Sequence, residues 1–313
     1  MKIGTRGSDL ALAQANVIVE AITDKLDVTP EVIVIKTRGD RIIDRPLREL
    51  ERWGFFTKEI EDALLDGRID AAVHSFKDMP SKMPEGLVVA AVTERENPGD
   101  LLIIKPEAYS DNLAHSISSP PVSGVGEKSS IIHLRRGARV GTSSVRRSVQ
   151  LKSMRSDLEI IDLRGNVPTR LRKLADGQYD VVMIAQAGVN RLKVDLTQFR
   201  AIMIDPTRFV PAAGQGALVV QVRENDPRLD DVAAILNHET TEQATSLERK
   251  VMDRFGGGCG LPLGVYARPT GIDWEIHGFW GGDPEQPVWA SVRGFPDDNL
   301  VEKLFRKLRV SNK

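Results

Sequence analysis

This chain of 313 residues has little cysteine, little net charge and no long apolar run. Cysteine occurs once, at position 259, which excludes an internal disulfide framework and a metal cluster built on several thiolates. The net charge is -1, because 43 Lys and Arg nearly balance 44 Asp and Glu. This balance argues against a general binder of nucleic acid or of membrane surfaces, so any basic site must be local.

No apolar run approaches the roughly 20 residues that a membrane-spanning helix needs. The first ten residues, "MKIGTRGSDL", lack the apolar core of a signal peptide. We therefore expect a cytoplasmic protein without a membrane, nucleic-acid or metal partner. We also expect it to be a monomer. A hydrophobic content of 41% over this length is enough for two or three domains with cores of their own.

Two parts of the chain resemble each other, and the order of the similar segments is the same in both. The similar pairs are 2–8 with 139–147, 32–40 with 158–166, and 57–75 with 169–187. Each part has the pattern strand, helix, strand, helix, strand, which predicts an α/β fold of two similar lobes with parallel sheets covered by helices. Two such lobes imply a cleft between them.

Local signals support this duplicated pattern. Thr57 and Thr169 are suited to be helix N-caps, and Gly67 and Gly177 to end the two helices. The apolar runs that follow are typical of buried parallel strands, and they occupy residues 71–73 and 181–184.

The remaining segments predict an insertion and a third domain. Residues 106–138 are rich in Ser, Pro and Gly, which favours a flexible insertion. From residue 238 the pattern changes to a helix (240–255), a Gly-rich loop, two strands (274–280 and 287–295) and a final helix (297–308), typical of a small α+β domain. The predicted domains are 1–100 with 216–236, then 101–215, then 237–313.

Arginines recur near the predicted strand ends of both parts. The second part has Arg146, Arg147, Arg164, Arg170 and Arg191, and the first offers Arg6 and Lys77. Arginine suits bidentate recognition of carboxylate or phosphate, and open α/β sheets bind ligands at the carboxyl ends of their strands. Solvated surface arginines are the plain alternative, but recurrence in a duplicated fold favours a polyanionic ligand. No P-loop motif is present.

The segment "AAVHSFKDMP" (71–80) contains a predicted buried strand and places Lys77 and Asp78 just after the end of that strand. A carboxylate there could exchange a proton or stabilise a developing cation. It could instead make a loop hydrogen bond before Pro80. His74 lies within the apolar run, so we interpret it as a structural residue.

The only cysteine lies in "RFGGGCGLPLG" (254–264), with glycine on both sides. Glycine permits unusual backbone angles and a close approach by another group. The thiol could pack inward as a small hydrophobe, or the glycines could give a ligand access to the sulfur. The residues alone leave both readings open.

Nine short motifs follow one another along the chain: "TRGSDLALAQ", "TRGD", "FTKEIEDALL", "AVHSFKDMP", "GTSSVRR", "LRGNVPTRL", "AGVNRL", "PAAGQGAL" and "GGGCGLPLG". As an ordered set they resemble the porphobilinogen deaminase family over nearly the whole chain. The resemblance implies two periplasmic-binding-protein-like lobes and a small third α+β domain. It also implies a transferase of porphyrin and heme biosynthesis, which joins four porphobilinogens head to tail into the linear tetrapyrrole hydroxymethylbilane and releases ammonia.

By the same resemblance, a dipyrromethane cofactor is bound to Cys259 through a thioether, and Asp78 is the catalytic aspartate. The residues that match the family's cofactor-binding positions are Lys77, Asp78, Thr142, Ser144, Arg146, Arg147 and Arg170. Those that match positions for incoming substrate or the growing chain are Arg6, Ser8, Arg164, Arg170 and Arg191. Gln14 and Gln215 are further candidates for polar contacts.

The chain departs from the family at two places. Arg52 and Trp53 stand where Gly and Lys are usual, and the insertion 106–138 is longer than we expect. Two other functions compete with the resemblance. A two-lobed anion-binding protein would not need Cys259 or Asp78, and a Cys-dependent acyl transferase needs a base near the thiol, for which the sequence gives no signal.

Overall fold

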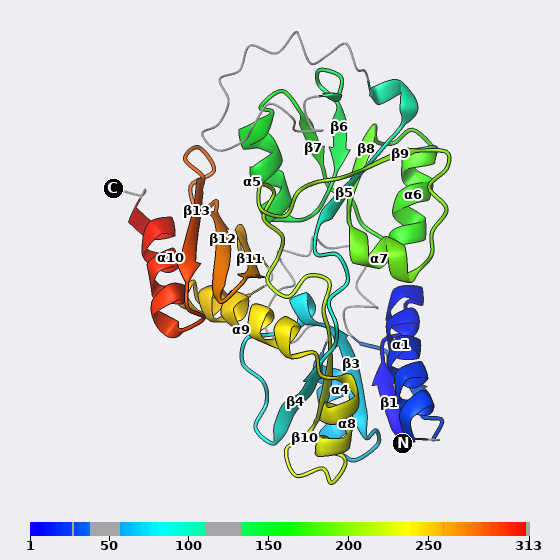
Figure 1. Cartoon of the computed structure of the whole chain (residues 1–313). Coiled ribbons are helices and arrows are strands. Elements are labelled where there is room, and N and C mark those ends of the chain that lie inside the picture. The colour runs from blue at the N-terminus through cyan, green and yellow to red at the C-terminus, as the bar shows by residue number, and fades with distance from the viewer. Residues whose placement is uncertain (27, 38–56, 110–132, 259, 311–313) are drawn as a thin grey trace.

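Two five-stranded sheets and one three-stranded sheet organise the molecule (Figure 1). The computed structural model describes residues 1–26, 28–37, 57–109, 133–258 and 260–310. In Figure 1 the first lobe lies at the bottom, the second lobe at the top and the C-terminal unit to the left. None of the helices within these ranges is long and apolar enough to cross a membrane.

The first lobe contains a sheet with the strand order β2-β1-β3-β10-β4. Strands β1, β2 and β3 pair in parallel, whereas β10 is antiparallel to both of its neighbours. Its strands are β1 (Lys2–Thr5), β2 (Glu31–Val34), β3 (Ala71–Ser75), β4 (Leu87–Val92) and β10 (Leu218–Arg223). Its helices are α1 (Asp9–Leu26), α4 (Lys58–Leu65), the 3-10 turn η1 (Phe76–Asp78) and α8 (Leu229–Leu236).

The second lobe repeats this arrangement with the order β7-β6-β8-β5-β9. Here β7, β6 and β8 are parallel, and β5 is antiparallel to β8 and β9. Its strands are β5 (Asp100–Ile104), β6 (Arg139–Gly141), β7 (Glu159–Ile161), β8 (Val181–Ala185) and β9 (Arg200–Met203). Its helices are η2 (Pro106–Ala108), α5 (Val145–Met154), α6 (Val167–Ala175) and α7 (Gln186–Arg191).

The duplicated strand–helix pattern is therefore confirmed, and its strands pair in parallel as predicted, but each sheet also contains an antiparallel strand that was not predicted. The antiparallel strand in each sheet comes from outside the duplicated segment of that lobe. Strand β5 precedes the second repeat in the chain, and β10 follows it. Consequently the chain passes between the lobes twice, through residues 93–99 and 204–217.

Local predictions fare differently. Thr57 occupies the N-cap of α4, and Gly67 and Gly177 follow the helix ends with φ of 70° and 76°. Thr169 is not a cap: Asn166 caps α6, and its side chain accepts from the Thr169 amide at 3.0 Å. Helices such as α6 begin where a side-chain oxygen can satisfy an orphan amide, and Asn166 meets this need one turn earlier.

The prediction of a flexible insertion at 106–138 is wrong at both ends. Ala108, Leu134 and Ala138 are buried in the core of the second lobe. Tyr109 forms a β-bridge with Leu134, which ties the two ends of the segment together. Residues 110–132 lie outside the described ranges.

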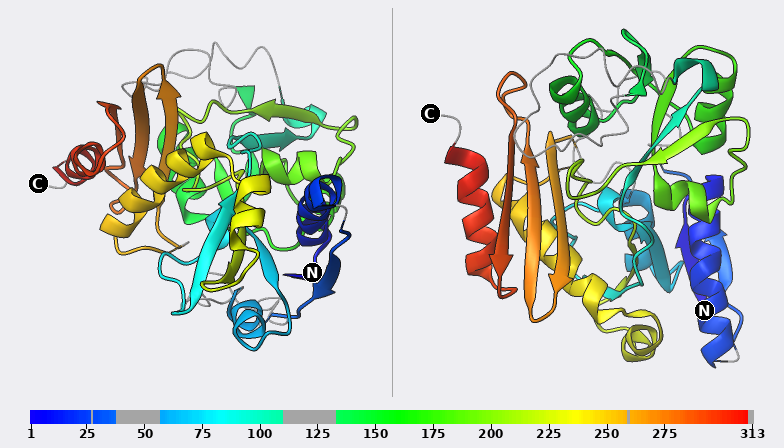
Figure 2. Two further views of the ribbon diagram at one scale, coloured as in Figure 1. Left: turned by 60° about the horizontal axis from the view of Figure 1, so that its bottom comes forward. Right: turned by 45° about the horizontal axis from the view of Figure 1, so that its top comes forward.

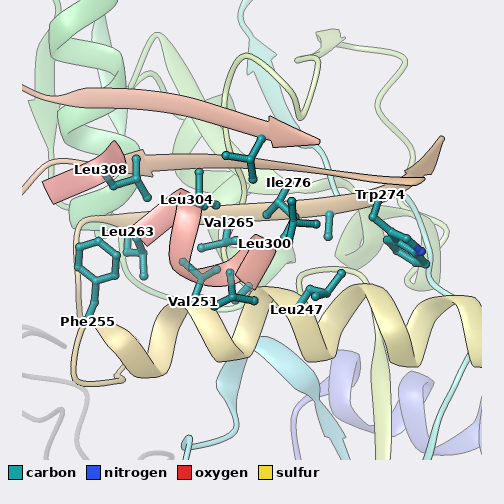
Figure 3. Close-up of a cluster of buried hydrophobic side chains, with 14 of the residues drawn as sticks. Leu247, Val251, Phe255, Leu263, Val265, Trp274, Ile276, Leu300, Leu304 and Leu308 are labelled. Atoms are coloured by element: carbon teal, nitrogen blue, oxygen red, sulfur yellow. The ribbon is translucent and has the colours of Figure 1, made fainter. Parts of the chain in front are cut away.

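The C-terminal unit packs two helices on one face of a small sheet. Its elements are α9 (Glu239–Arg254), β11 (Leu263–Thr270), β12 (Asp273–Trp280), β13 (Val288–Gly294) and α10 (Asp298–Val310). Figure 3 shows its core, in which Leu247 and Val251 of α9 and Leu304 of α10 meet Val265 and Ile276 of the sheet. The predicted strands 274–280 and 287–295 and both helices are confirmed, whereas β11 was not predicted. In the left view of Figure 2, α9 lies between this sheet and the first lobe. The domain boundaries stay a prediction.

Candidate active site

A pocket of about 220 Å³ lies where the two lobes, their crossovers and the C-terminal unit meet. Four basic side chains and the carboxylate of Asp78 line it, together with apolar side chains of the C-terminal unit. The lining residues are Lys77, Asp78, Ser143, Ser144, Val145, Arg146, Arg147, Arg170, Ala212, Ala213, Gln215, Met252, Gly258, Gly260, Leu261, Leu263 and Val265. A site with one apolar wall and several cations suits a ligand that carries carboxylates on an apolar body.

Lys77 and Asp78 reach the pocket because β3 ends in a single 3-10 turn. The turn Phe76–Asp78 follows Ser75 directly. The Phe76 amide donates to the carbonyl oxygen of Ala217, the residue before β10, at 3.0 Å. Phe76 is buried and anchors the turn, while Asp78 is exposed. Burial of the Lys77 ammonium lowers its pKa, although the nearby Asp78 carboxylate acts in the opposite direction.

Arg146 and Arg147 enter the pocket from the first turn of α5. Ser144 caps this helix, and its hydroxyl accepts from the Arg147 amide at 3.4 Å. Arg146 Nη2 donates to Asp100 Oδ2 at 2.9 Å, and Arg147 Nη2 donates to Asp100 Oδ1 at 2.7 Å. The other Nη atoms donate to the carbonyls of Val210 and Met183. One carboxylate therefore fixes both guanidinium groups.

Asp100 is a functional residue that the sequence reasoning missed. Its side chain is fully buried at the start of β5, where Gln215 Nε2 donates to Oδ1 at 2.8 Å. Burial would raise the pKa of Asp100, but Arg147 and Arg146 outweigh it and hold the pKa well below its usual value. Asp100 is therefore the ionised counter-ion of a buried arginine pair. The only signal in the sequence was an acidic residue directly before the apolar run of β5.

Part of the hydrogen-bonding capacity of the arginines is not used within the described residues. Arg147 Nε and Arg164 Nη1 are buried there without a hydrogen-bond partner. Burial lowers the pKa of Arg170 to about 10, and the positive charges of Arg147 and Arg164 act in the same direction. Buried donors and mutually repelling cations favour the binding of an anion.

The residues predicted for incoming substrate lie, apart from Arg170, outside the lining of this pocket. Arg191 Nη2 donates to Gly216 O at 2.6 Å, and burial lowers its pKa to about 10. Ser8 precedes α1, and its hydroxyl accepts from the Ala11 amide at 3.3 Å. Arg6 is half-buried near His74, whose pKa it helps to lower. Arg164 follows β7, close enough to Arg170 to lower its pKa.

Thr142, Gln14 and His74 contribute to the framework. Thr142 is buried, and its hydroxyl accepts from the Ser144 amide at 3.2 Å. Gln14 Nε2 donates to Ser75 Oγ at 2.8 Å, just before the Asp78 turn. His74 contacts Gln221 Oε1 at 3.2 Å, and burial lowers its pKa to about 4. His74 is therefore neutral near pH 7, which is consistent with the interpretation of a structural residue.

The Gly-rich loop borders the pocket. Gly258 and Gly260 line it, and Gly256, Gly257 and Gly258 have φ of 92°, 69° and 113°, in the region that favours glycine. Cys259, which stands between two lining residues in the sequence, lies outside the described residues, as do Arg52 and Trp53. Within the described residues, no three His, Cys, Asp or Glu side chains gather in a group that could hold a metal ion.

Comparisons with solved structures give similarity at the level of fold only. A periplasmic substrate-binding protein of an ABC transporter from Coxiella burnetii is 16% identical, with a TM-score of 0.43 over 80% of this chain and 96% of that chain. Immunogenic lipoprotein A from Vibrio vulnificus is 12% identical, with a TM-score of 0.42 over 79% of this chain and 98% of that chain.

Comparisons of sequence are far more specific. A porphobilinogen deaminase from Nitratidesulfovibrio vulgaris strain DP4 is 44% identical over 87% of this chain and 79% of its own length. One from Syntrophus aciditrophicus is 41% identical over 97% of this chain and 95% of its own length. The family model described as "Porphobilinogen deaminase, dipyromethane cofactor binding domain" matches residues 1–231. The chain thus belongs to the porphobilinogen deaminase family of transferases, with that family's dipyrromethane cofactor-binding domain.

Proposed function

We propose that this chain condenses four porphobilinogens into hydroxymethylbilane, on a dipyrromethane cofactor that is bound through a thioether to Cys259. The observation that carries the proposal is that one pocket is lined by Lys77, Asp78, the pair Arg146 and Arg147, and the glycines on either side of Cys259. When bound, the cofactor supplies the free pyrrole α-carbon from which the product grows.

The described residues fit such a group. A dipyrromethane carries acetate and propionate side chains, which need cationic partners. Four basic side chains line the pocket, and the buried Arg147 Nε has no partner among the described residues. The apolar wall formed by Met252, Leu261 and Leu263 suits the pyrrole rings.

We assign cofactor binding to the residues at the pocket and substrate binding to those around it. The cofactor carboxylates are held by Lys77, Ser144, Arg146, Arg147 and Arg170. Thr142 helps to position Ser144, because its hydroxyl accepts a hydrogen bond from the Ser144 amide. Arg6, Ser8, Arg164, Arg170 and Arg191 hold the incoming substrate or the growing chain. What supports this division is that the first set, apart from Thr142, lines the pocket, whereas the second, apart from Arg170, lies outside its lining.

Asp78 acts on charge that develops during the reaction. In each round the aminomethyl C–N bond of one porphobilinogen breaks and ammonia leaves. A bond then forms between its methylene carbon and a free pyrrole α-carbon, which loses a proton. Ammonia leaves from the protonated aminomethyl group, and the positive charge passes to the pyrrole ring of an azafulvenium-type cation. The fixed carboxylate of Asp78 stabilises this ring charge, which the uncharged pyrrole ring of the bound substrate lacks.

Intact mass and turnover test the proposal together. The purified protein should carry an adduct of two pyrrole units and convert porphobilinogen to hydroxymethylbilane with release of ammonia. Cys259→Ser should fold but lack both the adduct and the activity. The bare chain mass with reversible anion binding would instead indicate a binding protein, and a transient ester adduct would indicate an acyl transferase. The cytoplasmic location and the monomeric state stay predictions.

A further inference from the structure

Arg249 of α9 reaches across to the turn that carries Lys77 and Asp78. Its Nη1 donates to the carbonyls of Phe76 at 3.4 Å and Met79 at 3.2 Å, and its Nη2 donates to Pro80 O at 2.6 Å. The guanidinium carbon lies 4.6 Å from the centroid of the Phe76 ring. These contacts bracket residues 77 and 78 on both sides.

The turn has little internal support. Its N-cap, Ser75, makes no side-chain cap hydrogen bond, and a backbone bond spans the turn from the Met79 amide to Phe76 O at 3.2 Å. The planar guanidinium of Arg249 donates hydrogen bonds to three carbonyls of this segment. Because its donors have a fixed geometry, these bonds restrain the orientation of the turn. Arg249 itself is not among the described residues that line the pocket.

The same helix also leads to the Gly-rich loop. Helix α9 ends at Arg254, five residues before Cys259 in the sequence. Beyond the helix, a Cβ at Gly257 would come within 2.7 Å of Ser81 Oγ, so the loop backbone approaches the chain just after the Asp78 turn. The contacts of α9 and the close approach of the loop backbone therefore tie the end of β3 to the C-terminal unit.

We propose that Arg249 is a positioning residue for Asp78: by holding the carbonyls of Phe76, Met79 and Pro80, it fixes the carboxylate relative to the unit that carries Cys259. This inference depends on the proposed function, because it takes Asp78 to be the catalytic carboxylate. Arg249 then affects turnover through Asp78, without touching substrate or cofactor.

The test compares Arg249→Gln with Arg223→Gln. Arg223 is a matched control, since its Nη1 donates to the carbonyls of Leu64 at 2.7 Å and Ile69 at 2.9 Å in the same lobe, away from the pocket. Arg249→Gln should keep its two-pyrrole adduct and its KM for porphobilinogen, while kcat falls about ten- to a hundredfold, as for a misplaced catalytic group. Arg223→Gln should lower stability and leave kcat unchanged.

A second pair of variants excludes a general structural effect. In the Asp78→Glu background, Arg249→Gln should cost much less in kcat than in the wild type, because groups that act as a unit are not additive. Arg249→Lys keeps the charge but loses the planar fork, so its kcat should be intermediate. If the Gln variant does not fold, the Lys variant decides the question, since wild-type kcat there overturns the proposal.

The outcomes separate this inference from the function on which it depends. Wild-type kcat in Arg249→Gln, or an equal loss in Arg223→Gln, overturns the role of Arg249 and leaves the proposed function standing. A wild-type protein that does not turn over porphobilinogen, or an Asp78→Asn variant with undiminished kcat, overturns the proposed function or its Asp78 assignment instead.

Discussion

At the scale of single residues, the pocket combines one exposed carboxylate with a buried ion cluster. Asp78 is exposed at the pocket, whereas Asp100 is fully buried between Arg146 and Arg147. The two carboxylates therefore have different tasks. Asp100 offsets one of the two positive charges and orients both arginines, whereas in the proposed function the charge of Asp78 acts on the ligand.

The charge of Asp78 can be separated from its polarity by two substitutions. Asp78→Asn keeps the size of the side chain but removes the charge, and Asp78→Glu keeps the charge but displaces it by one methylene. We expect the Asn variant to hold cofactor and be nearly inactive, with a loss of about a hundredfold or more, because electrostatic stabilisation of the transition state is lost. The Glu variant should retain measurable turnover. If Asp78 only shaped the turn before Pro80, Asn would be tolerated better than Glu.

Residue types in the sequence were sufficient to find the pocket but not its internal pairing. Asp78, Arg146 and Arg147 were predicted from motifs at strand and helix ends, and all three line one pocket. Asp100 was missed because its pairing depends on β5 entering the second sheet between β8 and β9. Arg249 was missed because its contacts to the Asp78 turn join residues about 170 positions apart, which no local pattern reveals.

At the scale of elements, strand β10 lies between β3 and β4 of the first sheet, although it follows the second lobe in the sequence. It brings Gln221 next to His74 of β3, and these two side chains form a buried polar pair. Gln221 of β10 accepts from His74 Nε2 of β3 at 3.2 Å, since an amide oxygen can only accept. Gln221 Nε2 then donates to Glu61 of α4 at 3.4 Å. Burial raises the pKa of Glu61 and lowers that of His74 to about 4. The repeat predicted β3 itself, but the antiparallel partner came from beyond the second repeat.

This pair predicts a pH dependence of stability with a definite sign. The folded state keeps His74 neutral down to about pH 4, whereas the unfolded chain takes up a proton near pH 6.5. The contribution of His74 to the free energy of unfolding should therefore fall as the pH drops from 6.5 to 4, by about 3 kcal/mol for a shift of this size. The raised pKa of Glu61 acts in the opposite direction, so the comparison with a variant isolates His74.

Urea unfolding at pH 7, 5.5 and 4 measures this effect in the wild type and in His74→Gln. The wild type should lose more of its free energy of unfolding across this range than the variant, which has no imidazole to protonate. Parallel pH profiles for the two proteins would contradict the assignment.

At the scale of the whole molecule, the two crossovers and the C-terminal unit are joined by one buried carboxylate. Glu248 of α9 is fully buried and accepts from both Nη atoms of Arg95 at 2.7 and 3.0 Å. It also accepts from the amide of Gly214 at 2.7 Å and from that of Ala267 at 2.9 Å. Arg95 and Gly214 belong to the two segments that pass between the lobes, and Ala267 belongs to β11. The pocket depends on all of these parts being held together.

Glu248→Gln should therefore loosen the whole assembly rather than one element. A neutral amide leaves Arg95 buried without its counter-ion, and breaking a buried pair in this way costs about 3–5 kcal/mol. Glu302→Gln is the control, because Glu302 on α10 pairs with Arg306, whose side chain is 74% exposed, and an exposed pair contributes about 1 kcal/mol or less. Urea unfolding gives both values, and limited proteolysis of the Glu248 variant should cut the crossover segments 93–99 and 204–217 first. Equal losses in the two variants, or cleavage that starts elsewhere, would mean that Glu248 stabilises only its own helix.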